Sequence, residues 1–142
     1  MSAFPIRIAI ADKDPMFRTA VAERITAHSS GMIRVVLQAG NGAELLTRLE
    51  QIMPDIVLMD LNMPVLDGFS TARYLSVLFP EVTLVGFLQE LDESRVVEMG
   101  QGGLHSLICE DEAPSRMVSV LHRIASGETY RSPAFSAFYE AI

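Results

Sequence analysis

Acidic residues stand at the ends of three apolar segments of this sequence. Asp12 follows the first segment, Asp60 ends a second, and Glu110 follows a third. Carboxylates gathered at one place can hold a hard cation such as Mg²⁺, and a single carboxylate can act as the nucleophile that accepts a phosphoryl group. Acids can also simply cap helices, which suits Asp14 and Asp111. That interpretation fits Asp60 poorly, because Asp60 is followed by a Pro-containing turn rather than by a helix.

Other side chains of this sequence offer less chemistry. The three histidines, His28, His105 and His122, are scattered and form no metal-binding motif. The single cysteine, Cys109, excludes an internal disulfide and a zinc site built from several thiolates, and it fits a reducing compartment. The acids are therefore the candidate functional residues.

These acids can meet if the apolar segments are parallel strands of one sheet, because the carboxyl ends of such strands lie at the same edge. Residues 56–59 are four apolar residues in a row, which is typical of a strand buried on both faces of a parallel sheet. Apolar residues at helical spacing occupy the intervening segments. We predict strands at 6–11, 33–37, 55–60, 82–87 and 104–109, with helices after Asp14, after Asn41, at about 68–78, at 92–99 and around 117–125.

This alternation indicates the fold class. Strands that alternate with helices pair in parallel through right-handed crossovers, so we expect a single α/β domain with a doubly wound, five-stranded parallel sheet. Three helix ends carry recognisable signals: Asp14 before Pro15 as an N-cap, Asn41 with Glu44 as a capping box, and Gly127 as a C-terminal stop. In such a sheet the functional crevice lies at the carboxyl ends of the strands, where the acids are placed.

The segment around Asp60 resembles a known family. Residues 56–68, Ile-Val-Leu-Met-Asp-Leu-Asn-Met-Pro-Val-Leu-Asp-Gly, look like the phosphoacceptor segment of response-regulator receiver domains. Residues 8–18 resemble the first acidic turn of that family, which usually reads Asp-Asp-His-Pro. Residues 126–133 are similar to the end of receivers that continue into a LuxR-type helix-turn-helix. The resemblance covers about residues 5–133 and implies the flavodoxin-like receiver fold.

The resemblance assigns expected roles to three residues of an acidic pocket. Asp60 matches the phosphoacceptor, and Asp12 matches the first of two acids in the acidic turn. Asn62 matches the position whose backbone carbonyl normally binds Mg²⁺. Any weak Mg²⁺ site is therefore expected at these three residues.

Four positions depart from the family pattern. Lys13 replaces the second acid, which is normally a direct Mg²⁺ ligand. Leu88 stands where a Thr or Ser normally binds the phosphoryl group, and Glu110 stands where a Lys normally does. Leu107 takes the place of the aromatic switch residue.

These departures keep the formal charge of the pocket and change its chemistry. The Lys13 ammonium is a compact charge that we expect to pair with Asp60 or Asp12 and to repel a metal ion. Losing one charge-stabilising donor typically costs roughly 3–4 kcal/mol in the transition state. We therefore expect no metal site and no required cofactor, with Mg²⁺ binding doubtful. In an alternative arrangement Lys13 points to solvent and Asp14 becomes the metal ligand.

Several functions remain open at this point. The leading hypothesis is an atypical receiver, a signalling and protein-interaction module of a transcription regulator whose Mg²⁺-dependent phosphorylation is lost or strongly weakened. The alternative is a conventional receiver that a histidine kinase phosphorylates on Asp60. A haloacid-dehalogenase-like hydrolase would need a second Asp where Asn62 stands, so we do not expect an enzyme. A flavodoxin-like FMN protein is disfavoured, because the first loop is acidic and would repel phosphate.

Composition limits the partners. The 142 residues contain 18 acids against 11 Lys plus Arg, a formal net charge of −7, whereas nucleic-acid binding needs a basic face. DNA is therefore expected to bind only through a C-terminal domain absent from this chain. No apolar run approaches the roughly 18 residues that cross a bilayer and no signal peptide is visible, so we expect a cytoplasmic protein without membrane contact.

The end of the sequence is predicted to lie outside the domain. We place the receiver domain at residues 5–127 and interpret residues 128–142 as a linker or short helix leading toward a DNA-binding domain. One apolar stripe in this tail either packs on the domain, frays as part of a linker, or serves dimerisation or docking. The expected partners are a histidine kinase or another signalling protein, and a second copy in a homodimer. The stripe consists of Phe135, Phe138, Tyr139 and Ile142.

Overall fold

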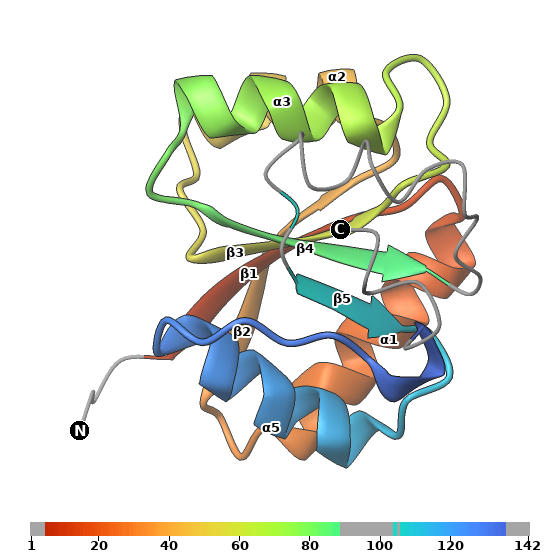
Figure 1. The fold of residues 1–142 in the computed structure, drawn as a ribbon, viewed down its shortest axis with the longest axis vertical. Helices are drawn as coiled ribbons and strands as arrows, with labels where there is room; N and C mark the ends of the chain where they lie inside the picture. The colour runs from red at the N-terminus through yellow and green to blue at the C-terminus, as the bar shows by residue number, and fades with distance from the viewer. Residues whose placement is uncertain (1–4, 89–103, 105, 136–142) are drawn as a thin grey trace.

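The computed structural model describes residues 5–88, 104 and 106–135, and within this part it confirms the predicted fold class (Figure 1). Five parallel strands form one sheet in the order β2-β1-β3-β4-β5. The helix predicted at 92–99 lies outside the described residues. The elements are β1 (Ile6–Ala11), α1 (Pro15–His28), β2 (Ile33–Ala39), α2 (Gly42–Leu49), β3 (Ile56–Asp60), α3 (Gly68–Leu78), β4 (Thr83–Leu88), β5 (Ser106–Cys109) and α5 (Pro114–Ala125).

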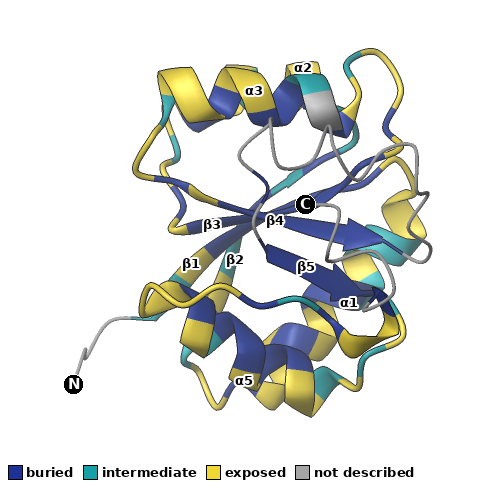
Figure 2. Cartoon of the chain, in the orientation of Figure 1, coloured by how far each residue is buried: buried dark blue, intermediate teal, exposed yellow. Residues whose placement is uncertain are grey.

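Helices cover both faces of the sheet. Helices α2 and α3 lie on one face, and α1 and α5 lie on the other (Figure 1). Each face has its own apolar core, because alternate residues of every strand point to opposite sides. Strand β3 is buried along its whole length (Figure 2), as its uninterrupted apolar run predicts.

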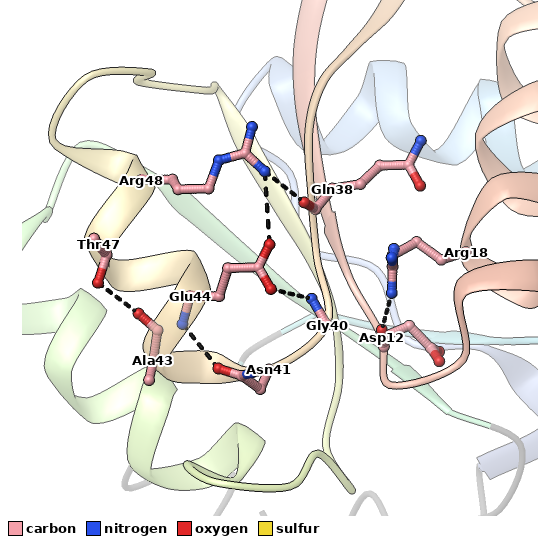
Figure 3. Close-up of polar contacts among 9 residues, drawn as sticks. All are labelled: Asp12, Arg18, Gln38, Gly40, Asn41, Ala43, Glu44, Thr47 and Arg48. Carbon is pink, nitrogen blue, oxygen red and sulfur yellow. Dashed lines mark hydrogen bonds and ion pairs between the residues drawn. The ribbon is translucent and has the colours of Figure 1, made fainter.

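Two helix starts show why the chain folds locally as predicted. The Asp14 carboxylate accepts the backbone N–H of Met16 at 3.0 Å. At the next helix, Asn41 Oδ1 accepts the backbone N–H of Glu44 at 2.8 Å (Figure 3). The capping box at α2 is modified. The Glu44 carboxylate accepts the N–H of Gly40 at 3.1 Å, one residue before the cap. The loop after β2 is therefore tied to the first turn of α2.

Strand β1 has the predicted limits, and the limits of the other four strands differ from the prediction by one or two residues. Strand β2 extends to Ala39 rather than to residue 37, because Gln38 and Ala39 pair with Ile10 and Ala11 of β1. This extension brings the end of β2 level with the end of β1. None of the helices that the structure describes is long and apolar enough to cross a membrane.

The segment after α5 packs against the sheet as far as Phe135. In this segment, residues 129–135, which we call the strap, Arg131 forms a parallel bridge with Leu107 of β5. Leu107 N–H donates to the Tyr130 carbonyl at 2.8 Å, and Ser132 N–H donates to the Leu107 carbonyl at 3.0 Å. Tyr130, Ser132 and Phe135 are buried. The predicted linker thus begins as part of the core, and the apolar stripe beyond Phe135 lies outside the described residues.

Candidate functional site

Two buried carboxylates stand side by side at the carboxyl ends of β1 and β3. Ala11 of β1 pairs with Met59 of β3, so Asp12 and Asp60 each follow by one residue on neighbouring strands. Asp12 is 4% exposed and Asp60 is 8% exposed. The strand order reverses between β1 and β3, which is where doubly wound sheets place their functional crevice.

Backbone amides fix one oxygen of each carboxylate. The Asp14 N–H donates to Asp12 Oδ1 at 2.9 Å, and the Asn62 N–H donates to Asp60 Oδ1 at 3.0 Å. Both contacts reach two residues along the chain, which is the Asx-turn pattern. The loops themselves therefore orient the two acids.

A close backbone approach shapes the loop after Asp60. The Gly68 N–H donates to the Leu61 carbonyl at 3.2 Å. A Cβ at Gly68 would lie 2.5 Å from Leu61 Cα and 2.8 Å from the Asp60 carbonyl oxygen. Only glycine lets α3 begin this close to the end of β3.

Arg18 supports the loop that carries Asp12, a role that sequence reasoning missed. Its guanidinium donates to the Asp12 carbonyl at 2.8 Å (Figure 3), while the Asp12 N–H donates to the Ala39 carbonyl at 3.0 Å. Arg18 lies four residues after the Asp14 cap, one helical turn into α1. That spacing is the only sequence signal for this contact.

The two acids open into a pocket of about 480 Å³. The sequence analysis named three residues of an acidic pocket and four departures from the family pattern. Six of these seven residues line the pocket, so the structure brings them together. Phe17, which stacks on Phe87 with 5.9 Å between ring centroids, forms part of its wall, and this too was not predicted. The lining residues are Asp12, Lys13, Asp14, Phe17, Asp60, Asn62, Leu88 and Glu110.

The seventh residue, Leu107, lies away from the pocket. It is buried in the core beneath α2 and α3, beside Gly86. Leu88 ends β4 and pairs with Cys109, so the pocket residues Leu88 and Glu110 belong to adjacent strand ends. The position expected for a switch residue is thus filled by an ordinary core side chain.

The pocket raises the pKa of two of its acids. Burial is the largest cause of the rise in the pKa of Glu110 to about 7, and the nearby charges of Asp12 and Asp60 raise it further. Burial likewise raises the pKa of Asp12, with Asp60 adding to the effect, while the hydrogen bond from the Asp14 amide opposes it. Proximity to Lys13 lowers both pKa values without cancelling the rise.

The predicted ion pair of Lys13 with Asp60 or Asp12 is not formed. The ion pairs in the described part of the chain join Arg48 to Glu44, Arg116 to Glu112, and Arg123 to Glu128. Lys13 borders the pocket but is exposed.

Lys13 forms no ion pair because an ammonium on a flexible side chain stays hydrated, unless new contacts compensate for the loss of its bound water. Asp14, the alternative metal ligand, is engaged at the start of α1 instead. Its carboxylate accepts the N–H groups of Met16 and Phe17 at the start of α1.

The side chains of this pocket fit Mg²⁺ poorly. One oxygen of Asp12 and one of Asp60 accept a backbone N–H, which leaves one oxygen of each for a metal ion. Lys13, which lines the same pocket, adds a cation where the family resemblance implies a third acidic ligand, whereas Mg²⁺ demands nearly octahedral oxygen ligands. Among the residues that the structure describes, no group of three or more His, Cys, Asp or Glu side chains is arranged to hold a metal ion.

Comparisons with known proteins identify the family. The model of the response regulator receiver domain family matches residues 8–122, and the chain belongs to this family. It is 32% identical over 132 residues to the nitrate/nitrite response regulator NarL of Escherichia coli K12, which covers 93% of this chain and 60% of NarL. It is 28% identical over 128 residues to the response regulator GacA of Pseudomonas viridiflava, covering 90% and 59%. The chain thus spans about 60% of the length of these relatives.

Solved receiver structures share the fold. The isolated receiver of RcsB from Salmonella enterica serovar Typhimurium superposes with a TM-score of 0.82 at 16% identity, covering 94% of this chain and 98% of the other. The receiver of the response regulator NarL from Mycobacterium tuberculosis gives a TM-score of 0.80 at 24% identity, covering 88% and 99%. The chain is therefore a receiver domain of the two-component response-regulator type, with transcription regulators among its relatives.

Proposed function

We propose that this chain is an atypical receiver in which Mg²⁺-dependent phosphorylation of Asp60 is lost or strongly weakened. It then acts as a signalling and protein-interaction module of a two-component-type transcription regulator. The observation that carries the proposal is the pocket wall beside Asp60. It contains Leu88 and Glu110 at the two positions where the family resemblance implies a hydroxyl and an ammonium.

The physical argument concerns charge. A phosphoryl group on Asp60 would bring about −1.5 to −2 charges at neutral pH, and phosphoryl transfer depends on donors and cations that hold its oxygens. Leu88 offers no donor. Glu110 offers either a repelling carboxylate or a neutral carboxyl, but no cation. The exposed Lys13 replaces a ligand of the metal that would neutralise the remaining charge.

Restoring the three side chains tests the proposal. The purified chain and the variant Lys13→Asp/Leu88→Thr/Glu110→Lys are incubated with Mg²⁺ and acetyl phosphate, and labelling is measured by intact mass spectrometry. We expect no acyl phosphate on the unsubstituted chain and labelling of the triple variant. Adding Asp60→Asn to the triple variant should abolish that labelling. Equal labelling of the unsubstituted chain and the triple variant on Asp60 would favour a conventional receiver that a histidine kinase phosphorylates.

Membership of the receiver family also suggests the partners and the cellular location. We propose that the domain contacts a histidine kinase or another signalling protein and forms a homodimer in the cytoplasm. DNA binding would belong to a C-terminal domain outside this chain, because this domain is strongly acidic and its transcription-regulating relatives are longer. The domain itself is proposed to have no enzymatic activity.

A further inference from the structure

The strap is held by a largely buried polar network that no local sequence pattern predicts. Glu112, in the loop between β5 and α5, accepts hydrogen bonds at Oε1 from the hydroxyls of Tyr130, at 2.7 Å, and Ser132. Its other oxygen, Oε2, is buried without a hydrogen bond and lies 3.8 Å from Arg116 Nε. A buried carboxylate is costly unless donors satisfy it, and the strap supplies two of them.

Ser132 connects this network to the pocket. Its side chain is fully buried, and its Oγ accepts the backbone N–H of Cys109 at 2.8 Å while its hydroxyl donates to Glu112. Cys109 is followed directly by Glu110, which lines the pocket and whose N–H donates to the Leu88 carbonyl at 3.0 Å. The loop that places Glu110 at the pocket is thus the same loop that holds the strap.

We propose that Glu112 is a latch that holds the strap on β5 and links its position to the charge at Glu110. In the latched state the hydroxyls of Tyr130 and Ser132 satisfy Glu112. In the released state water replaces them, and the strap leaves the edge of β5. This inference does not depend on whether Asp60 accepts a phosphoryl group, because the contacts of the latch involve neither Asp60 nor a metal. It makes the strap a two-state element that carries the state of the pocket to the chain after residue 135.

The contacts around Tyr130 support a discrete latched state. The Tyr130 N–H donates to Ser106 Oγ at 3.1 Å. The guanidinium carbons of Arg116 and Arg123 each lie 6.0 Å from the centroid of the Tyr130 ring. Both arginines belong to α5. Release of the strap therefore breaks contacts with β5 and with α5 together, which favours a cooperative change over gradual fraying.

Hydrogen exchange of the whole chain tests the latch. The variants are Glu112→Ala and Ser132→Ala, with Glu128→Ala as the matched control, because Glu128 is an exposed acid next to the strap that pairs only with Arg123 in the contacts described. Hydrogen bonds to a charged group are strong enough that either latch variant should raise exchange at residues 129–135 by about tenfold or more. Exchange in β1 and β3 should stay unchanged.

The outcomes separate a latch from ordinary destabilisation. Strap exchange that rises in the latch variants but not in Glu128→Ala supports the proposal. Unchanged strap exchange, or an equal rise in the strap and in the core strands, overturns it.

The link to the pocket has its own measurement. Glu110→Lys replaces repulsion by Asp12 and Asp60 with attraction, which should steady the loop and slow strap exchange by about threefold or more. The same change made in the Glu112→Ala background should leave strap exchange where Glu112→Ala alone puts it. An equal effect of Glu110→Lys in both backgrounds, or no effect in either, overturns the link.

Discussion

Replacing Glu110 by glutamine should change how the stability of this domain depends on pH. Burial and the neighbouring acids raise the pKa of Glu110 from its usual 4.5 to about 7 in the folded chain. Between these two values the folded protein holds a proton that the unfolded chain has lost. The free energy of unfolding therefore falls as the pH rises through this window, and above pH 7 the full penalty of the charged form is present. Glutamine has the same shape and carries no such penalty.

The size of the effect follows from the width of that window. Each pH unit in which only the folded state is protonated is worth about 1.4 kcal/mol, which sets a ceiling of about 3 kcal/mol. Glu110 is only partly buried, and solvent screening reduces the interaction. We therefore expect Glu110→Gln to be more stable than the unsubstituted chain by about 1–2 kcal/mol at pH 8, and nearly equal to it at pH 4.5.

Urea unfolding followed by far-UV circular dichroism measures this difference. Circular dichroism is the suitable probe because the chain contains no tryptophan. The free energies of unfolding of both proteins are compared from pH 4.5 to pH 8, with Glu23→Gln as the control for an exposed glutamate. A stability difference that does not vary with pH, or one equal to that of the control, would refute the reasoning about the pocket.

Two further predictions concern the loop between β3 and α3. Val65 has a φ of 68°, a left-handed conformation that strains a β-branched residue, and it is 83% exposed. Val65→Asn should therefore raise the free energy of unfolding by about 1 kcal/mol and the melting temperature by about 4 °C. A lower melting temperature would contradict this backbone strain. Gly68→Ala should cost about 2 kcal/mol or more in urea unfolding, because its Cβ would meet Leu61 and the Asp60 carbonyl. Gly40→Ala is the control, since its Cβ would meet only ordinary contacts, and an equal cost for both variants would show that close approach is not the cause.

The fold was predictable because its signals are local. Strand β3 contains four apolar residues in a row before Asp60. Asp14 and Asn41 each cap a helix by accepting an N–H from a residue no more than three positions further along the chain. The convergence of Asp12 and Asp60 then follows from parallel pairing alone. A single sequence is enough to predict such features, because each pattern involves only residues that are close together along the chain.

The missed features depend on distant residues or on a choice of rotamer. Ser132 meets Cys109 across 23 residues of chain, and nothing in the local pattern marks a serine that will be fully buried. Lys13 was placed at the pocket correctly, but position along the chain does not determine whether a long side chain pairs or stays hydrated.

The charge of the pocket bears on how such a domain can signal. Without a bound phosphoryl group, an input can shift the domain only if it binds its two states with different affinity. The acids at the pocket and the latch at Glu112 share one short loop, so an input that changes the charge near Glu110 acts on the same backbone that holds Ser132. A cationic group brought to the pocket would relieve the repulsion among Asp12, Asp60 and Glu110, as a metal ion does in an ordinary acidic site. If phosphorylation of Asp60 is lost, as we propose, one input is removed while the contacts from Cys109 through Ser132 to Glu112 stay in place.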